Sequence, residues 1–184
     1  LHSPRAVMSV EIAVRKRYAA AAQKKEKVLC CAVGYNAKYL EAIPEEVVER
    51  DYGCGDPSQY LREGETVLDL GSGTGKICFI ASQVVGPEGF VIGVDLTDEM
   101  LEIARRNAPI VAKNVGHANV EFRKGRIQDL TLDFDLLDAK LKSASLSGLK
   151  GFLEAEAIAG KLRNESPMIS SGSIDVVVSN CVLN

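Results

Sequence analysis

The pattern of apolar and polar positions changes near residue 64, and each side of that point predicts a different kind of structure. On the N-terminal side, residues 10–25 are rich in alanine and contain no proline or glycine, which favours a helix. Short helices are also expected at residues 36–40 and 44–50, the second with a proline in its first turn. Glycines and a proline then gather in residues 52–57, which predicts a loop.

Beyond residue 64 the pattern alternates between short apolar runs and longer helical segments. Helices are expected at residues 76–85 and 98–107, the second with Thr97 as its N-cap. Such alternation predicts a parallel sheet with right-handed crossovers, a Rossmann-like, doubly wound α/β fold. The last of these segments, residues 174–179, is almost wholly apolar, as expected for a strand that is buried on both faces. The four expected strands are residues 66–70, 90–96, 120–123 and 174–179.

These elements divide the chain into two parts. Residues 1–62 form the expected N-terminal helical segment with its cysteine-containing loop, and residues 63–184 form the α/β domain. An insertion at residues 131–172 separates the third and fourth strands. It contains one amphipathic stretch, residues 149–162, which predicts one additional helix.

Composition excludes several classes of function. The 184 residues suffice for one domain with a sizeable core, and the net charge of -3 gives no positive field for nucleic acid. No apolar run approaches the roughly 20 residues needed to span a membrane. Residues 1–10 lack the apolar core of a signal peptide, so a cytoplasmic protein is expected. Five cysteines, an odd number, fit reduced thiols better than a disulfide framework.

The first candidate ligand site is the turn Gly71-x-Gly73-x-Gly75 between the first strand and its helix. Glycines allow a tight turn and a close approach of the backbone to a ligand. Dinucleotide sites use a related spacing with one more residue before the last glycine, and Asp69 stands where a cationic amino-acid ligand would lie. Ile77 after Lys76 excludes a phosphate-binding P-loop. These details favour S-adenosylmethionine over a dinucleotide as the cofactor.

Asp95 ends the second strand, where a carboxylate accepts hydrogen bonds from ribose hydroxyls. The alternative is a charge at the helix N-terminus beside Thr97. After the third strand, residues 125–129 stand where an adenine normally lies. Many related domains carry an acid where this chain has Arg126, so Gln128 or Asp129 is left to bind the adenine amino group, and the Ile127 N–H to bind the ring. The candidate cofactor-binding residues are Asp69, Gly71, Ser72, Gly73, Thr74, Gly75, Asp95, Leu96, Met100, Ile127, Gln128 and Asn180.

The cysteines suggest a more specific chemistry. Cys54 lies in the glycine loop, and Cys181 follows the fourth strand at the sheet edge where ligands bind. Taken singly, a cysteine is more often a small buried apolar residue, which is our interpretation of Cys78. Two thiols beside a cofactor cleft suit a soft, thiophilic ion. Cys30 and Cys31 are further candidates in the N-terminal segment.

Four stretches resemble arsenite methyltransferases: residues 51–57, 64–73, 91–101 and 179–184. The specific parts are Tyr-Gly-Cys-Gly at 52–55 and Asn-Cys-Val at 180–182, and the resemblance spans roughly residues 28–130 and 172–184. It implies that Cys54 and Cys181 bind As(III) as substrate, with Cys30 or Cys31 as a further ligand and another cysteine beyond residue 184. A thiol reductant is the expected partner. A methyltransferase sheet usually has seven strands. Either strands from elsewhere complete this sheet or, as we expect, the chain is a fragment whose C-terminal strands are missing.

The resemblance implies direct transfer, in which the lone pair of thiolate-bound As(III) attacks the sulfonium methyl without a general base. His2 and His117 lie near no motif and are expected on the surface. One alternative is a methyltransferase of another small molecule, with structural cysteines and a base beyond Asn184. The other is a non-catalytic module that binds the cofactor or zinc. Zinc sites commonly use Cys pairs two to four residues apart, and Cys30 and Cys31 are adjacent.

Overall fold

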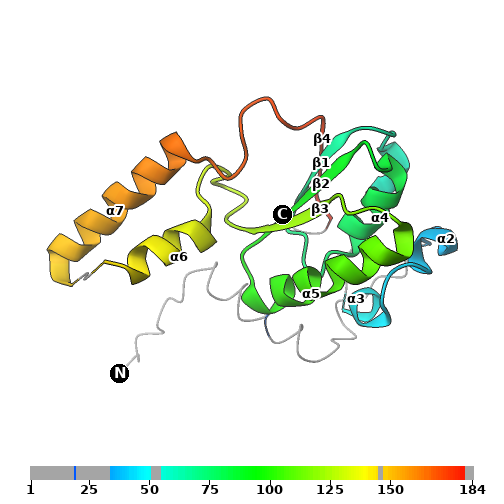
Figure 1. Cartoon of the computed structure of the whole chain (residues 1–184), viewed down its shortest axis with the longest axis horizontal. Coiled ribbons are helices and arrows are strands. Elements are labelled where there is room, and N and C mark those ends of the chain that lie inside the picture. Colours follow the sequence, from blue (N-terminus) through cyan, green and yellow to red (C-terminus); the bar gives the residue numbers. More distant parts are fainter. Residues whose placement is uncertain (1–18, 20–33, 51–54, 145–146, 181–184) are drawn as a thin grey trace, which may run out of the picture.

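A four-stranded parallel sheet forms the centre of the molecule (Figure 1). The computed structural model describes residues 19, 34–50, 55–144 and 147–180. The strands lie in the order β3-β2-β1-β4, and helices connect β1 to β2 and β2 to β3. This arrangement confirms the predicted Rossmann-like fold. The strand bounds are β1 (Thr66–Leu70), β2 (Phe90–Asp95), β3 (Val120–Lys124) and β4 (Val176–Val178).

Strand β1 lies inside the sheet because both of its faces are apolar. Val67 is fully buried and belongs to the core cluster beneath the helices. Leu68, 2% exposed, points to the other face, where it joins a second cluster with Ile92 and Met168. Successive side chains on a strand point to opposite faces, so the neighbouring residues Val67 and Leu68 bury one face each, and the strand also buries the Asp69 carboxylate.

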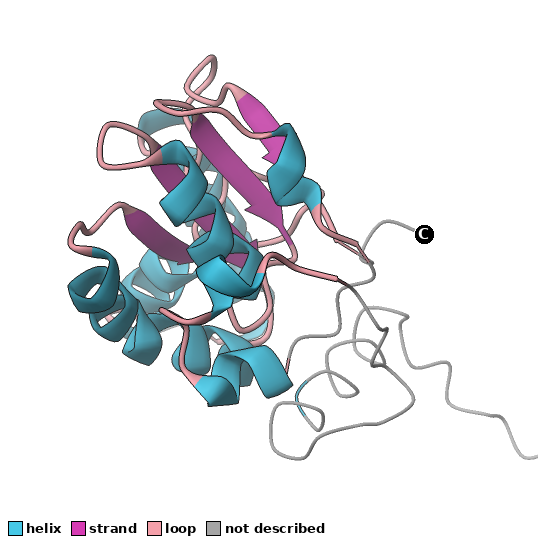
Figure 2. Cartoon of the chain, turned by 90° about the vertical axis from the view of Figure 1, so that its right-hand side faces the viewer, coloured by secondary structure: helices cyan, strands magenta, loops and turns pink. Residues whose placement is uncertain are grey.

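Two long helices cover one face of the sheet, as Figure 2 shows from the side. Helix α4 spans Lys76–Val85, as predicted, and α5 spans Asp98–Val115. The predicted end of α5 at residue 107 was wrong, because the helix continues through Pro109. Its buried face extends past this proline to Val111, so packing against the core outweighs the lost backbone hydrogen bond. The helix ends at Gly116, whose φ is +92°.

Strand β4 is shorter than the predicted run of residues 174–179. The Asp175 side chain accepts a hydrogen bond of 2.8 Å from the Thr66 N–H, just before the first strand residue, Val176. The Asp175 N–H also donates to the Thr66 carbonyl at 3.0 Å, so a side-chain acceptor and a backbone donor of the same residue pair with Thr66 at this end. The expected burial of this strand on both faces was wrong, because Val177 is 55% exposed on β4, which is an edge strand of the described sheet.

Short helical segments precede the sheet and pack on the helical layer. Helix α2 (Ala37–Leu40) is capped by Asn36, whose side chain accepts a hydrogen bond from the Lys38 N–H. Helix α3 (Glu45–Glu49) follows Pro44, as predicted, and buries Val47 in the core. A 3-10 helix, η2 (Pro57–Tyr60), follows. The helix expected at residues 10–25 lies outside the described residues, apart from residue 19, and the boundary at residues 62 and 63 stays a prediction.

The insertion contains two helices, so the prediction of one was wrong. Helix α6 (Phe134–Lys142) and α7 (Gly148–Glu165) form a hairpin that extends away from the sheet (Figure 1). Asp133 caps α6 by accepting hydrogen bonds from two backbone N–H groups, a capping signal that the sequence contains. The pair has its own small core, in which Leu137 packs against Ala159 and Leu162.

None of the helices in the described part of the chain has both the length and the apolar character that crossing a membrane requires.

Candidate functional site

The turn after β1 depends on its three glycines, which all have positive φ values: +78° at Gly71, +55° at Gly73 and +90° at Gly75. Side chains rarely adopt this conformation. The N–H groups of Gly71 and Ser72 donate to the Val94 carbonyl at 2.8 and 3.1 Å, which fixes the turn on the end of β2. The turn leads into the first residues of α4 at the C-terminal edge of the sheet.

Asp95 connects this turn to the end of β2. Its carboxylate accepts hydrogen bonds from the Gly73 N–H at 2.9 Å and the Thr97 N–H at 2.8 Å. Burial raises the pKa of Asp95, and these backbone donors oppose the rise. A carboxylate oxygen can accept two hydrogen bonds, so both oxygens of Asp95 keep acceptor capacity for a ligand. The contact with the Thr97 N–H is the one that the alternative, a charge at the start of α5, requires, and binding of ribose by Asp95 stays a prediction.

Asp69 is a nearly fully buried carboxylate, 2% exposed, on β1 directly before the turn. The Cys78 thiol of α4 donates a hydrogen bond to it at 3.3 Å. Burial raises the pKa of the Cys78 thiol well above its usual value, and the Asp69 charge raises it further, so the group stays protonated. Cys78 is buried, as expected, but it also orients a carboxylate at the edge of the site, which residue type alone did not reveal.

Ser72 and Thr74 shape the turn from within. The Thr74 hydroxyl donates to the Val47 carbonyl at 3.1 Å and so attaches α3 to the turn. The Ser72 hydroxyl is buried against Gly93 of β2, where an added Cβ would lie 2.8 Å from it. Both side chains therefore face protein rather than the open side of the turn.

The turn at residues 125–129 lies next to Asp95, since the Gly125 N–H donates to the Asp95 carbonyl at 3.0 Å. Ile127 is half-buried and Gln128 is exposed. The Asp129 carboxylate accepts hydrogen bonds from the Thr131 hydroxyl at 2.7 Å and from Arg163 Nε at 2.9 Å. These contacts lower the pKa of Asp129, Thr131 having the larger effect. Of the two residues considered for the adenine amino group, Gln128 is therefore the one whose side chain remains accessible.

The loops at this edge are joined by contacts that the sequence did not reveal. The Gly55 carbonyl accepts hydrogen bonds from the Asn180 amide at 2.8 Å and the Tyr35 hydroxyl at 2.9 Å. The buried Lys76 amine lies 3.9 Å from the centre of the Tyr35 ring. The Ser179 hydroxyl donates to the Leu70 carbonyl at 3.1 Å, which brings the end of β4 beside the start of the glycine turn.

Several predicted site residues lie elsewhere or outside the described residues. Met100 is buried in the core beneath α5, 2% exposed, and Leu96 is half-buried beside Asp95. Within the described residues, no group of three or more His, Cys, Asp or Glu side chains could hold a metal ion. The thiols proposed as ligands, Cys30, Cys31, Cys54 and Cys181, are all outside the described residues.

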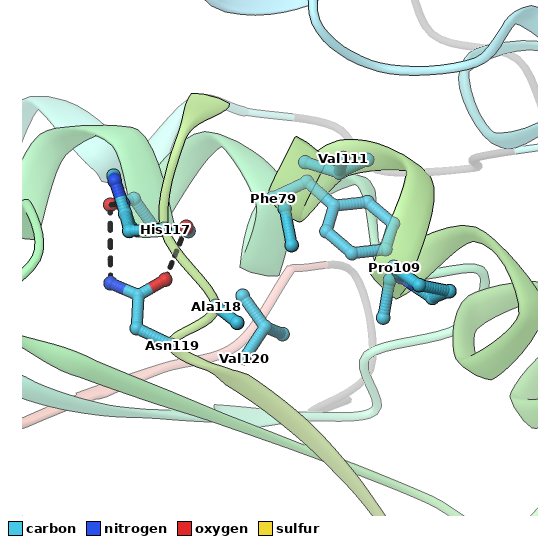
Figure 3. Close-up of a pocket in the computed structure, with 10 residues that line it drawn as sticks. Phe79, Pro109, Val111, His117, Ala118, Asn119 and Val120 are labelled. Atoms are coloured by element: carbon cyan, nitrogen blue, oxygen red, sulfur yellow. Dashed lines mark hydrogen bonds between the residues drawn. The ribbon is translucent and has the colours of Figure 1, made fainter. Parts of the chain in front are cut away.

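A cavity of about 210 Å³ lies at the opposite edge of the sheet, between α4, α5 and the start of β3 (Figure 3). Its polar groups already have partners: the His117 ring contacts the Ser82 carbonyl at 3.2 Å, and Asn119 accepts from the Ser82 hydroxyl at 2.5 Å. His117 was expected on the surface but is half-buried here. The cavity is thus separate from the predicted site.

Comparisons with known proteins show which family the chain belongs to. Residues 61–154, 94 of the 184, match the family model described as methyltransferase domain. The chain is 38% identical over 79% of its length to an arsenite methyltransferase of Aquipseudomonas alcaligenes, and 32% identical over 79% to that of Homo sapiens. It covers 32% and 30% of those proteins, so it spans about a third of the curated relatives.

A solved structure shares this similarity. An arsenic (III) S-adenosylmethionine methyltransferase from Chlamydomonas reinhardtii matches with a TM-score of 0.53 and 30% identity, over 79% of this chain and 38% of that one. Sequence, fold and glycine turn therefore lead to one conclusion. The chain belongs to the methyltransferase domain family and, within it, is similar to the arsenite methyltransferases.

Proposed function

We propose that this chain is the cofactor-binding part of an arsenite methyltransferase, which transfers a methyl group from S-adenosylmethionine to As(III) held by cysteine thiolates. The observation that carries the proposal is the hydrogen bond from Asn180 to Gly55. Cys181 follows Asn180 in the sequence and Cys54 precedes Gly55, so this contact joins the two segments that carry the thiols. The names of the similar proteins support the same chemistry.

The charges and the backbone conformation of the glycine turn suit S-adenosylmethionine. A Cβ at Gly73 would meet no atom within 4 Å, so the turn has an open side for a ligand. Asp95 accepts hydrogen bonds from the ribose hydroxyls, and Asp69 attracts the ammonium group of the methionine part. The Ile127 N–H and the Gln128 side chain bind the adenine. When bound, S-adenosylmethionine supplies an electrophilic methyl group on a sulfonium.

The protein's part in the reaction is to position the substrate. Thiolates of Cys54 and Cys181, with Cys30 or Cys31, hold As(III) so that its lone pair faces the methyl group. The cofactor's methyl group would be accepted by this lone pair, and the residues of the glycine turn and Asp95 would hold the rest of the cofactor in place. No proton is removed, which agrees with a site that lacks histidine among its described residues, since His117 lies at the opposite edge. Positioning of this kind can lower the activation free energy of a reaction by about 7–11 kcal/mol.

The cofactor assignment is tested by calorimetry with S-adenosylhomocysteine and NADH. We expect the chain to bind the first and not the second. Asp95→Ala removes charge-assisted hydrogen bonds to the ribose, so binding should weaken by about 1.5–3 kcal/mol. Glu99→Ala, which removes a nearby carboxylate in the first turn of α5, serves as the control and should bind normally. Tighter binding of NADH than of S-adenosylhomocysteine would contradict the assignment.

The thiol assignment is tested by Cys54→Ser and Cys181→Ser in the full-length enzyme. Each variant should lose methylation of inorganic arsenite and keep its affinity for S-adenosylhomocysteine. Because thiolates are the binding form, arsenite uptake should release protons and weaken at low pH. If the double variant still methylates arsenite, these cysteines are not the ligands, and the cofactor assignment stands. A wild type that binds S-adenosylhomocysteine but never methylates arsenite would indicate another small-molecule substrate.

A further inference from the structure

The turn at residues 125–129 is held on two sides by parts of the chain that are far apart in sequence. On the sheet side, its first N–H donates to the Asp95 carbonyl. On the other side, the segment after the α6–α7 hairpin runs along the residues that follow the turn. The Met168 N–H donates to the Thr131 carbonyl at 3.0 Å, and the Ile169 N–H donates to the Leu130 carbonyl at 2.9 Å. The turn is therefore built between β2 and the insertion.

Side chains of the hairpin reinforce this backbone contact. Arg163 of α7 donates from Nε to the Asp129 carboxylate, which also accepts the Thr131 hydroxyl and the Thr131 N–H. The Arg126 guanidinium lies 5.5 Å from the ring centre of Phe134, the first residue of α6. Gly125 packs so closely on Met168 that an added Cβ would lie 2.6 Å from its Cε. Both ends of the turn are thus in contact with the hairpin or the segment after it.

The base of the hairpin is itself attached to the sheet and its helices. Arg105 of α5 donates to the Phe122 carbonyl of β3 at 3.0 Å and to the Asp135 carboxylate of α6 at 2.6 Å. The Arg123 guanidinium donates to the Met168 carbonyl. A movement of the hairpin base therefore acts on the turn rather than on the hairpin alone.

We propose that the α6–α7 hairpin is a positioning element of the adenine-binding turn, with Arg163 as the residue that holds Asp129 and thereby orients Ile127 and Gln128. This inference rests on the cofactor binding proposed above. Asp129 then has a structural role in the turn, and its carboxylate does not contact the adenine. The insertion has a function in cofactor recognition, although most of it extends away from the sheet.

The Arg163–Asp129 pair is well suited to a binding test because it is partly exposed. The side chains are 41% and 27% accessible, so removing the pair should change the stability of the fold only slightly. Binding should respond more, because the Gln128 amide and the Ile127 N–H, which meet the adenine, lie one and two residues before Asp129 in the sequence. Lys161 is a matched control. It is a cation on the same helix, and its ion pair, with Glu165 at 3.7 Å, stays within α7.

The experiment compares S-adenosylhomocysteine with S-inosylhomocysteine, in which a keto oxygen replaces the adenine amino group. Calorimetry on the full chain measures both dissociation constants for wild type, Arg163→Ala, Asp129→Ala, the double variant and Lys161→Ala. We expect Arg163→Ala to raise the constant for S-adenosylhomocysteine roughly fivefold, about the effect of 1 kcal/mol. The constant for S-inosylhomocysteine should change little, so base discrimination falls. The double variant should be no worse than either single variant.

The outcomes separate this inference from the proposed function. If wild type does not bind S-adenosylhomocysteine, the proposed cofactor binding is wrong. If wild type binds it and Arg163→Ala keeps the same affinity and discrimination, the hairpin does not position the turn and the cofactor assignment stands. An equal loss for both ligands, or the same loss in Lys161→Ala, likewise overturns the inference. Should Arg163→Ala unfold, Arg163→Lys, which keeps the charge but changes the donor geometry, is expected to show the reduced discrimination.

Discussion

Two glycines of the same turn have opposite surroundings. A Cβ at Gly75, where φ is +90°, would lie 2.5 Å from Phe122 Cζ and 3.2 Å from Phe79 Cε2, both in the core. A Cβ at Gly73, where φ is +55°, would meet nothing within 4 Å. Gly75 is therefore required for packing, whereas Gly73 leaves space at the open side of the turn.

This difference predicts that the two alanine variants have different defects. Gly75→Ala should lower the free energy of unfolding by about 2–4 kcal/mol, because it adds backbone strain and displaces a buried aromatic ring. Gly73→Ala should cost only about 1 kcal/mol of stability. Its added methyl group should nevertheless weaken S-adenosylhomocysteine binding more than tenfold, as a clash of a few kcal/mol does. Urea unfolding and calorimetry measure the two quantities, and equal stability losses in both variants would contradict the prediction.

At the scale of elements, α3 is joined to both α5 and the glycine turn. The Glu46 carboxylate contacts Arg106 at 2.5 Å and the Asn107 amide at 2.8 Å, both on α5. Thr74 of the turn bonds to the carbonyl of Val47, the next residue of α3. The hydrogen bond from Arg106 is the largest of the contacts that lower the pKa of Glu46 to about 2, from an ordinary value of 4.5.

The lowered pKa predicts a pH dependence of stability. A carboxylate whose pKa is lower in the folded state stabilises the fold above its unfolded pKa, and this contribution is lost as pH falls from about 4.5 toward 2. Because both side chains are partly exposed, the contribution should stay below about 1 kcal/mol. Thermal unfolding of wild type and Glu46→Gln should therefore differ at pH 6 and converge only as pH approaches 2. Glu45→Gln, on the same turn of α3, is the control, and a difference independent of pH would refute the link.

At the scale of the whole molecule, the parallel sheet decides which residues form the site. Four parts of the site lie at or just after the C-terminal ends of strands, and they therefore meet at one edge of the sheet. They are the glycine turn, Asp95, the turn at residues 125–129 and Asn180. The cavity that Figure 3 shows lies where β3 begins, at the other edge, and takes no part in this arrangement. Parallel strands place all of their C-terminal ends together, which is why ligand sites of this fold form there.

The sequence by itself determined the glycine turn and the order of strands and helices along the chain, because apolar periodicity and the conformational freedom of glycine are short-range properties. Only the tertiary structure decided that α5 continues through Pro109 and that α6 packs against α7, since side chains distant in the sequence form both contacts. It also decided the partners of Asp129 and Gly55. Arg163 is 34 residues from the first and Asn180 is 125 residues from the second, and contacts across such separations exist only once the chain has folded.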